Sequence, residues 1–343
     1  MSLPTRQLGS TGLEITTVGF GAWAVGGGGW GGGWGDQSDR DSIAAIRHGV
    51  EQGVNWIDTA PIYGFGRSEE VVGRALRDIP EPDRPFVFTK CGLVWDPEAA
   101  TPGPSNVMAA ESVRQELEAS LRRLGVERID LYQVHWPPTD GTPIEEYWAT
   151  MAELREAGKV RAIGLSNHDT KALTAAASIA HVDSVQPPFS LISRETAADV
   201  LPWCVANDAG AIVYSPMQSG LLTGAMTEER VAALPADDWR ASHDDFTGAG
   251  GRRNLALADA LRPVAERYGV PVASVAVAWT LSWPGVTGAI VGARQPDQVD
   301  GWLPAAGMTL SPDDLTELAG AIRRTGAGSG PEHPPQGPLS ARG

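Results

Sequence analysis

The feature that most constrains the fold is a regular alternation between short apolar runs and longer segments with helical periodicity. The runs are rich in β-branched and aromatic residues, which is typical of buried strands. Eight of them occur in succession: VGFGAW (18–23), NWIDTA (55–60), FVFTK (86–90), DLYQVHW (130–136), VRAIGLSN (160–167), DSVQPP (183–188), GAIVYSP (210–216) and GVTGAIVGAR (285–294). Strands that alternate with helices form parallel sheets with right-handed crossovers, and a succession of this length closes into a barrel. We therefore predict an α/β fold, a (β/α)8 TIM barrel.

The segments around these runs complete the predicted barrel. Apolar residues recur at helical spacing over 39–52 and 68–77, and Ser105 precedes a longer helical segment. Ahead of the first barrel strand, RQLGSTGLEIT (6–16) predicts an N-terminal β-hairpin. From Gly326 onward the chain is rich in Gly and Pro, so we expect a mobile C-terminal extension.

Composition limits the partners and the location of the protein. The chain has 343 residues, of which 42% are hydrophobic, enough for one barrel domain over 1–325 followed by a Gly/Pro-rich tail over 326–343. A formal net charge of −15 argues against nucleic acid and anionic membrane surfaces as partners. No apolar stretch reaches membrane-spanning length, the N-terminus lacks an apolar signal core, and Cys91 and Cys204 make no disulfide framework. We expect a cytoplasmic protein and leave its oligomeric state open.

Four polar residues accompany three neighbouring strand-like runs. Asp58 lies near the end of one run and Tyr63 follows it, Lys90 ends the next run, and His135 lies near the end of the third. In a TIM barrel, groups at the C-terminal ends of the strands converge on one mouth, where the chemistry takes place. An acid, a phenol, an amine and an imidazole at one mouth can transfer a proton to a bound substrate.

These four residue types suit the reduction of a carbonyl group. A tyrosine phenol titrates near pH ~10, and a neighbouring ammonium group lowers that pKa. We expect Lys90 to do this for Tyr63, Asp58 to hold Lys90, and His135 to donate a hydrogen bond to the same substrate oxygen. A proton then reaches the carbonyl oxygen while hydride reaches the carbonyl carbon.

Three motifs carry a resemblance to a known family. NWIDTAPIYGFGRSEEVVGRAL (55–76) is similar to the first signature of the aldo-keto reductases, and TK (89–90) and VHW (134–136) match the family's lysine and histidine positions. The resemblance extends from about residue 4 to about residue 325. It implies a small-molecule aldehyde or ketone as substrate and NADPH as cofactor, with NADH the less favoured alternative.

The resemblance also implies a role for each site residue. Tyr63 would be the general acid, Lys90 would tune it, Asp58 would orient Lys90, and His135 would position the carbonyl. The implied cofactor-binding residues are Gly21, Trp23, Ser166, Asn167, Gln186, Tyr214, Ser215, Met217, Gly220, Leu221, Gly292, Arg294 and Gln298.

Parts of the cofactor are assigned within this set. Ser166, Asn167 and Gln186 would hold the nicotinamide carboxamide, and Tyr214 would stack on the ring. Arg294, which follows a strand at the start of a helix, would bind the 2′-phosphate and is the main basis for expecting NADPH.

Three positions depart from the family pattern. Ala225 replaces a lysine found in many relatives after the LLTG segment, Phe189 replaces a common tyrosine, and Trp302 stands where an asparagine is frequent. These changes affect the expected cofactor preference rather than the chemistry.

Five tryptophans are candidates for the substrate pocket. They are Trp23, Trp30, Trp34, Trp95 and Trp136. Aromatic or bulky apolar aldehydes and ketones would stack on such walls, and a sugar-derived carbonyl is an alternative because sugar rings also pack on tryptophan faces.

Two connections stand apart from the strand–helix rhythm. The stretch GGGGWGGGWGD (26–36) contains G-x-G-x-x-G, with Glu51 at the spacing of a Rossmann ribose-binding acid. Such a match is almost automatic in a glycine run, so we favour a mobile first βα loop that presents Trp30 and Trp34 near the mouth. A surface loop without function is the remaining interpretation. Residues 217–250 form a long connection, a candidate functional lid.

Two other functions are compatible with these residues. One is a cofactor-binding regulatory subunit of the channel-β type, which shares the fold and the four polar residues but predicts very slow turnover and a stable partner complex. The other is a barrel lyase or isomerase that uses Tyr63 and Lys90 without a nicotinamide cofactor, and it requires that NADPH fail to bind.

Overall fold

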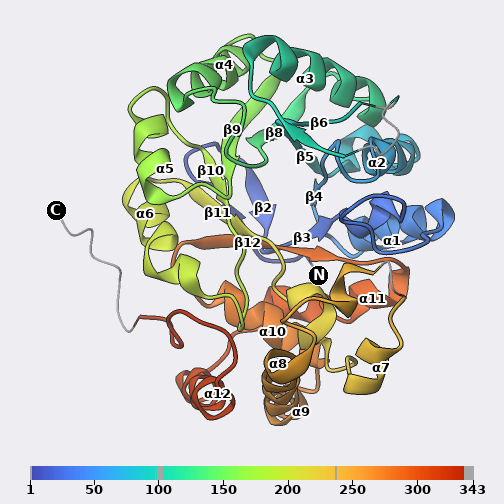
Figure 1. Ribbon diagram of the computed structural model, residues 1–343, viewed down its shortest axis with the longest axis vertical. Helices are drawn as coiled ribbons and strands as arrows, with labels where there is room; N and C mark the ends of the chain where they lie inside the picture. The colour runs from blue at the N-terminus through green and yellow to red at the C-terminus, as the bar shows by residue number, and fades with distance from the viewer. Residues whose placement is uncertain (1, 97, 99–102, 236–237, 336–343) are drawn as a thin grey trace.

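The computed structural model describes residues 2–96, 98, 103–235 and 238–335 and confirms the predicted (β/α)8 barrel. Eight parallel strands close on one another in chain order, with helices around them (Figure 1). The barrel strands are β3 (Val18–Gly21), β4 (Trp56–Asp58), β5 (Phe86–Cys91), β8 (Ile129–Val134), β9 (Val160–Ser166), β10 (Ser184–Gln186), β11 (Gly210–Val213) and β12 (Val286–Gly292). Each lies within, or one residue beyond, an apolar run identified above.

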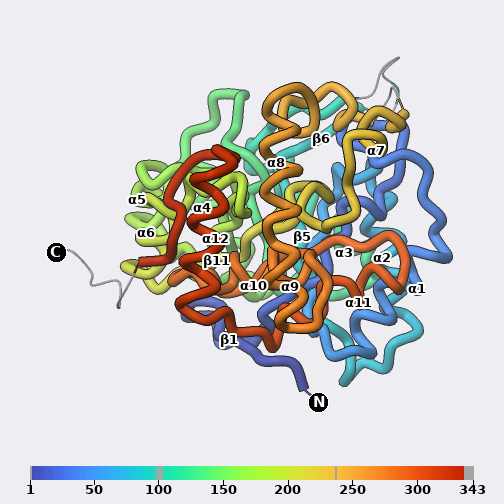
Figure 2. The backbone as a smooth tube through the Cα atoms, turned by 90° about the horizontal axis from the view of Figure 1, so that it is seen from below, coloured from blue at the N-terminus to red at the C-terminus, as the bar shows by residue number. Residues whose placement is uncertain are grey.

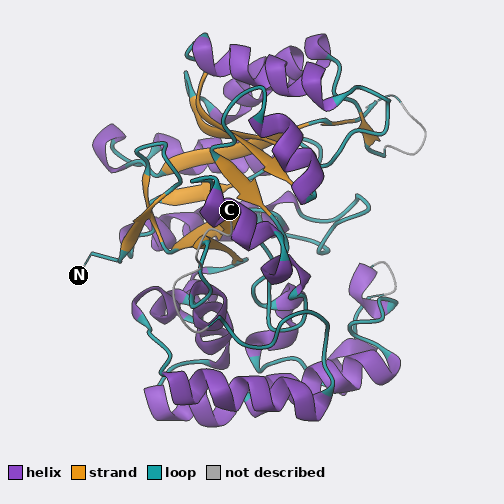
Figure 3. Cartoon of the chain, turned by 90° about the vertical axis from the view of Figure 1, so that its left-hand side faces the viewer, coloured by secondary structure: helices purple, strands orange, loops and turns teal. Residues whose placement is uncertain are grey.

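The strands form the wall of the barrel, and helices surround them on the outside (Figure 3). The helices of the described residues are α1 (Asp39–Glu51), α2 (Arg67–Arg77), α3 (Ala110–Leu124), α4 (Ile144–Glu156), α5 (Thr170–Ala177), α6 (Val200–Ala206), α7 (Glu228–Ala232), α8 (Gly248–Ala260), α9 (Arg262–Tyr268), α10 (Val272–Leu281), α11 (Pro296–Asp300) and α12 (Pro312–Thr325). A large apolar core lies between the helices and the outer face of the strands. None of the described helices is both long and apolar enough to cross a membrane.

The predicted N-terminal hairpin closes one end of the barrel. It consists of β1 (Thr5–Gln7) and β2 (Glu14–Thr16), and it lies in the centre of the ring in Figure 1. Leu8, Leu13 and Ile15 pack on apolar side chains inside the barrel in a separate core cluster. Because this hairpin leads directly into β3, it covers the N-terminal ends of the strands and leaves their C-terminal ends open.

A second small hairpin corrects one predicted helix start. Leu93–Val94 (β6) pairs with Ser105–Asn106 (β7) in an antiparallel sheet, and α3 begins only at Ala110. Ser105 is therefore in an extended strand rather than at the start of the helix.

The chain beyond α12 runs along the outside of the barrel (Figure 2). Arg194 donates hydrogen bonds to the carbonyl of Ala327 at 3.1 Å and to the carbonyl of Gly330 at 3.4 Å. Ala327 is 1% exposed. Residues 327–330 are thus packed against the barrel, which corrects our expectation of a mobile chain from Gly326; residues 336–343 of the predicted tail lie outside the described residues.

Candidate active site

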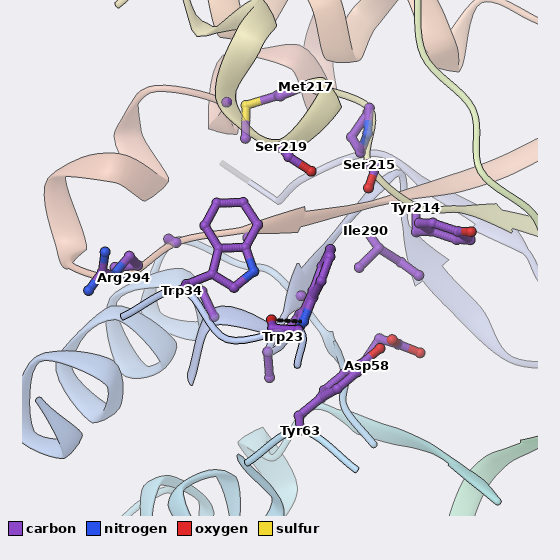
Figure 4. A pocket seen from close by; sticks show the side chains of 18 of the residues that line it. Trp23, Trp34, Asp58, Tyr63, Tyr214, Ser215, Met217, Ser219, Ile290 and Arg294 are labelled. Atoms are coloured by element: carbon purple, nitrogen blue, oxygen red, sulfur yellow. Dashed lines mark hydrogen bonds between the residues drawn. The ribbon is translucent and has the colours of Figure 1, made fainter. Parts of the chain in front are cut away.

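The open end of the barrel holds a cavity of about 740 Å³. Its walls come from the connections that follow β3, β4, β8, β11 and β12. Figure 4 shows Asp58, Tyr63 and Tyr214 toward one end of this cavity and Arg294 at the other, with Trp23 and Trp34 between them. The cavity is therefore elongated and carries different chemical groups at its two ends.

Three of the four predicted polar residues form one hydrogen-bonded group. Lys90 is fully buried, and its Nζ lies 2.5 Å from Asp58 Oδ1 and 3.4 Å from the Tyr63 hydroxyl. The carbonyl of Thr59 accepts a third hydrogen bond from the same ammonium at 2.9 Å. β4 and β5 are neighbours in the barrel, so Asp58 and Lys90 reach each other from adjacent strand ends. Asp58 and Tyr63 line the cavity while Lys90 lies behind them.

His135 faces the tyrosine from the other side. Its ring lies 5.7 Å from the Tyr63 ring in an edge-to-face arrangement, and the side chain lines the cavity. Burial, together with the nearby Lys90 ammonium, lowers the pKa of His135 well below its ordinary value. The imidazole is therefore neutral at pH ~7 and retains one N–H donor.

The electrostatics of Tyr63 correct one expectation. Burial raises the pKa of Tyr63 above its ordinary value, and the Lys90 ammonium offsets only part of that effect. Lys90 does lower this pKa, as predicted, but the loss of hydration outweighs the attraction of the ammonium, so the net shift is upward rather than downward. Burial lowers the pKa of Lys90, but Asp58 and Tyr63 together bring it above its ordinary value. Tyr63 keeps its proton and Lys90 keeps its charge.

The predicted nicotinamide-binding residues form a second network beside this group. Asn167, with a left-handed φ of 62°, donates to the backbone carbonyl of His135 and to Ser166 Oγ, both at 3.0 Å. The Tyr214 hydroxyl donates to Asn167 Oδ1 at 2.8 Å. Unlike Asn167 and Tyr214, Gln186 contacts the catalytic group directly, since its side-chain amide donates to Asp58 Oδ2 at 2.9 Å. It therefore links the two networks.

The cavity gathers nearly all the residues predicted to bind a cofactor. Those that line it are Gly21, Trp23, Ser166, Asn167, Gln186, Tyr214, Ser215, Met217, Gly220, Gly292, Arg294 and Gln298. Leu221 is fully buried in the core and is absent from the lining.

The predicted substrate tryptophans divide into two groups. Trp23, Trp30, Trp34 and Trp136 line the cavity, and Trp136 is 45% exposed. Trp95 lies outside the lining and packs on Phe65, with ring centroids 5.5 Å apart; Phe65 itself lines the cavity.

The long connection over 217–250 contributes residues that the sequence analysis did not single out. Trp239 stacks on Trp23 with ring centroids 6.3 Å apart and meets the edge of Trp34 at 6.4 Å. The Arg240 guanidinium lies 4.5 Å from the Trp34 ring centroid. This connection therefore contacts the first βα loop through side chains that only the fold brings together.

The departures from the family pattern lie in different surroundings. Ala225 and Trp302 both line the cavity. Phe189 is fully buried and packs against Trp279 and Trp283, at centroid distances of 5.4 and 5.5 Å.

Among the described residues, no group of three or more His, Cys, Asp or Glu side chains is arranged to hold a metal ion.

Comparisons with known proteins identify the family of the chain. The model of the aldo/keto reductase family matches residues 17–323. An aldo-keto reductase of Bacillus subtilis (strain 168) is 37% identical over 320 residues, with 93% of each chain covered. The NADH-specific methylglyoxal reductase of Escherichia coli (strain K12) is 35% identical, over 92% of this chain and 98% of the relative. The solved glycerol dehydrogenase of Gluconobacter oxydans is similar with a TM-score of 0.85 and 35% identity, covering 95% of this chain and 97% of that one. The chain belongs to the aldo/keto reductase family.

Proposed function

We propose that the protein reduces an aldehyde or ketone to an alcohol with NADPH, and that Tyr63 is the general acid. The observation that carries this proposal is the position of the buried Lys90 ammonium, which contacts both Asp58 and the Tyr63 hydroxyl at an open cavity. A protonated phenol is the form that a proton donor requires. Lys90 stabilises the phenolate that remains once the proton has moved to the substrate oxygen.

His135 has a positioning role in this proposal. As a neutral imidazole it donates one hydrogen bond to the carbonyl oxygen without adding a second positive charge beside Lys90. Asp58 balances the charge of Lys90 and fixes its direction through the contact at 2.5 Å. Tyr63, Lys90 and His135 are therefore each in the protonation state that carbonyl reduction needs at neutral pH.

The cavity fits an extended dinucleotide. Tyr214, which is hydrogen-bonded to Asn167, lies at the catalytic end, and Arg294 offers a cation at the other (Figure 4). Between them, Ser215, Ser219 and Gly220 have positive φ values of 56°, 52° and 100°. Backbone turns of this kind direct N–H groups into a concavity that suits phosphate oxygens. NADPH, when bound, supplies the hydride that reaches the carbonyl carbon.

Arg294 is the reason to propose NADPH rather than NADH. Its guanidinium lines the cavity and matches the geometry of a 2′-phosphate. The NADH-specific relative from Escherichia coli makes a direct comparison of the two cofactors necessary. Titration of tryptophan fluorescence serves this purpose because Trp23 and Trp34 lie in the cavity.

We propose aromatic or bulky apolar carbonyl compounds as substrates. Trp23, Trp30, Phe65 and Trp136 supply flat apolar walls near Tyr63. The names of two relatives add smaller compounds to a substrate screen, namely methylglyoxal and the oxidised forms of glycerol.

The decisive experiment is the substitution Tyr63→Phe. It should lower kcat by at least about 100-fold, the usual contribution of a general acid, and leave the Kd for NADPH within about twofold. Tyr268→Phe, on the exposed surface of α9, is the matched control and should change neither quantity. Unchanged turnover in Tyr63→Phe would exclude the proposed acid. Very slow turnover of the unsubstituted protein with tight NADPH binding would instead support a regulatory subunit, and failure to bind either cofactor would favour the lyase or isomerase alternative.

A further inference from the structure

Gln37, which follows the glycine-rich loop after β3, contacts Arg294, the arginine predicted to bind the 2′-phosphate. Gln37 Oε1 accepts a hydrogen bond from Arg294 Nε at 2.6 Å, and Gln37 Nε2 donates to the backbone carbonyl of Arg294 at 2.8 Å. The backbone carbonyl of the adjacent Asp36 accepts a further hydrogen bond from Arg294 Nη2. The loop therefore holds both the backbone and the guanidinium of Arg294, although these residues are 257 positions apart in the chain.

These contacts occupy one edge of the guanidinium and leave the other available. A guanidinium presents five N–H groups in a planar fork. Gln37 and Asp36 engage Nε and Nη2, which form the side edge. The end edge, with one N–H of Nη1 and the second N–H of Nη2, makes no hydrogen bond among the described residues. It offers a bidentate pair of donors to a phosphate, and Arg294 lines the cavity beside Trp34 (Figure 4).

Gln37 is itself held from two further directions. Its Nε2 also donates to Ser42 Oγ, in the first turn of α1, at 2.9 Å. Its backbone carbonyl accepts a hydrogen bond from Arg67 at 2.5 Å, and Arg67 is paired with Asp39 at 2.7 Å. Ser42 is fully buried. Gln37 therefore has a fixed place between the start of α1 and the loop after β12.

The charges around Arg294 leave its own charge available to a ligand. Asp39, at the start of α1, is paired with both Arg67 and Arg74. Asp238, which is close enough to Arg294 for their charges to interact, is paired with Arg240 at 2.7 Å. The groups that contact Arg294 directly are a neutral amide and a neutral carbonyl.

We propose that Gln37 is a positioning residue that selects the phosphorylated cofactor by holding Arg294 with its end edge toward the 2′-phosphate. The inference rests on the proposed function, in which Arg294 binds that phosphate. It gives the glycine-rich loop a role at the adenosine end of the site, in place of the Rossmann role that its glycines suggest. An arginine ordered beforehand loses little side-chain freedom when a phosphate binds, so the ordering favours NADPH and leaves NADH unaffected.

The test compares cofactor dissociation constants, measured by tryptophan fluorescence in the absence of substrate. Gln37→Ala should weaken NADPH binding by roughly tenfold, as expected for losing about one charge-assisted hydrogen bond, and change NADH binding by less than about twofold. Gln52→Ala, at the opposite end of α1, is the matched control and should change neither constant. The probe 2′,5′-ADP, which carries the 2′-phosphate without the nicotinamide, should lose affinity for Gln37→Ala by the same factor as NADPH.

A double substitution separates positioning from a general effect on the loop. In the Arg294→Ala background, Gln37→Ala should cause no further loss of NADPH affinity, because Gln37 acts only through Arg294. Equal losses for NADPH and NADH, an unchanged NADPH constant, or a further loss in the Arg294→Ala background would each overturn the inference. Failure of the proposed cofactor assignment is distinguishable from these outcomes, because the unsubstituted protein would then bind neither cofactor or would bind NADPH no more tightly than NADH.

Discussion

Gln133 donates a hydrogen bond from its side-chain amide to Asp58 Oδ2 at 3.1 Å, with both side chains buried. Gln186 donates to the same oxygen, and Lys90 donates to the other. The carboxylate thus has donors at both oxygens, which fix its orientation. The orientation of Lys90 beneath Tyr63 therefore depends on two amides as well as on Asp58.

Replacing Gln133 tests this dependence. Gln133→Met keeps most of the side-chain volume but removes the donor to Asp58, so Lys90 should be less well ordered toward Tyr63. We expect kcat to fall by about tenfold, equivalent to about 1.4 kcal/mol, with the Kd for NADPH unchanged because Gln133 lies outside the cavity lining. Steady-state kinetics and fluorescence titration measure the two quantities. Gln115→Met, at an exposed position on α3, is the control, and an unaltered kcat in Gln133→Met would show that the amide is dispensable.

A half-buried carboxylate outside the catalytic group, that of Glu116, predicts a dependence of stability on pH. Burial raises the pKa of Glu116 from 4.5 to about 7, although its oxygens accept hydrogen bonds from the Gly92 N–H at 2.9 Å and from Ser112 at 3.3 Å. The folded state therefore binds this proton more tightly than the unfolded chain does. The resulting stabilisation is fully present below pH 4.5 and is lost as the pH rises through about 7.

Glu116→Gln should remove this loss, because an amide stays neutral at every pH. The variant should have a higher Tm than the unsubstituted protein at pH ~8.5, by roughly 2–4 °C for each kcal/mol recovered, and the difference should shrink toward pH ~5. Thermal unfolding followed by circular dichroism at both pH values measures it. Glu118→Gln, on the exposed face of α3, is the control. A Tm difference that does not change with pH would contradict the assignment.

Most of the barrel was predictable because its determinants are local. A buried parallel strand is a short apolar run, and chain order alone places each run beside the next. The same logic located Asp58, Lys90 and His135, since each stands at the end of a strand and all strand ends meet at one mouth. Ser105 was misassigned because Ser is common at helix starts, whereas its pairing with Val94 depends on a partner in another part of the chain.

The remaining features depend on contacts between distant segments. Gln133 lies inside an apolar strand, and nothing local shows that its amide turns toward Asp58 rather than toward another strand. The contact between Arg194 and Ala327 spans 133 residues, so Gly/Pro-rich composition alone suggested mobility there. The pKa of Tyr63 was misjudged because the sequence shows a nearby ammonium but not the extent of burial. In each case the missing information is three-dimensional packing.

The contact between the first βα loop and the long connection after β11 predicts slow release of the cofactor. Trp239 stacks on Trp23 at an interplanar angle of 16°, and Arg240 lies over Trp34. Aromatic pairs of this kind contribute about 0.5–1.5 kcal/mol beyond their buried area. A bound dinucleotide that runs beneath this contact must wait for the two loops to separate before it leaves.

Trp239→Ala should therefore release NADPH faster, by about tenfold if the stacking and edge contacts together contribute about 1.4 kcal/mol to keeping the loops together. Stopped-flow displacement of bound NADPH by an excess of NADP measures the rate. Trp203→Ala is the control, because Trp203 lies on α6, outside the cavity lining, and its loss should leave the release rate unchanged. Trp34→Ala should give a similar increase, and the double variant should add little to it, because both side chains act through the same contact. Additive effects, or an unchanged rate in Trp239→Ala, would mean that the two loops move independently.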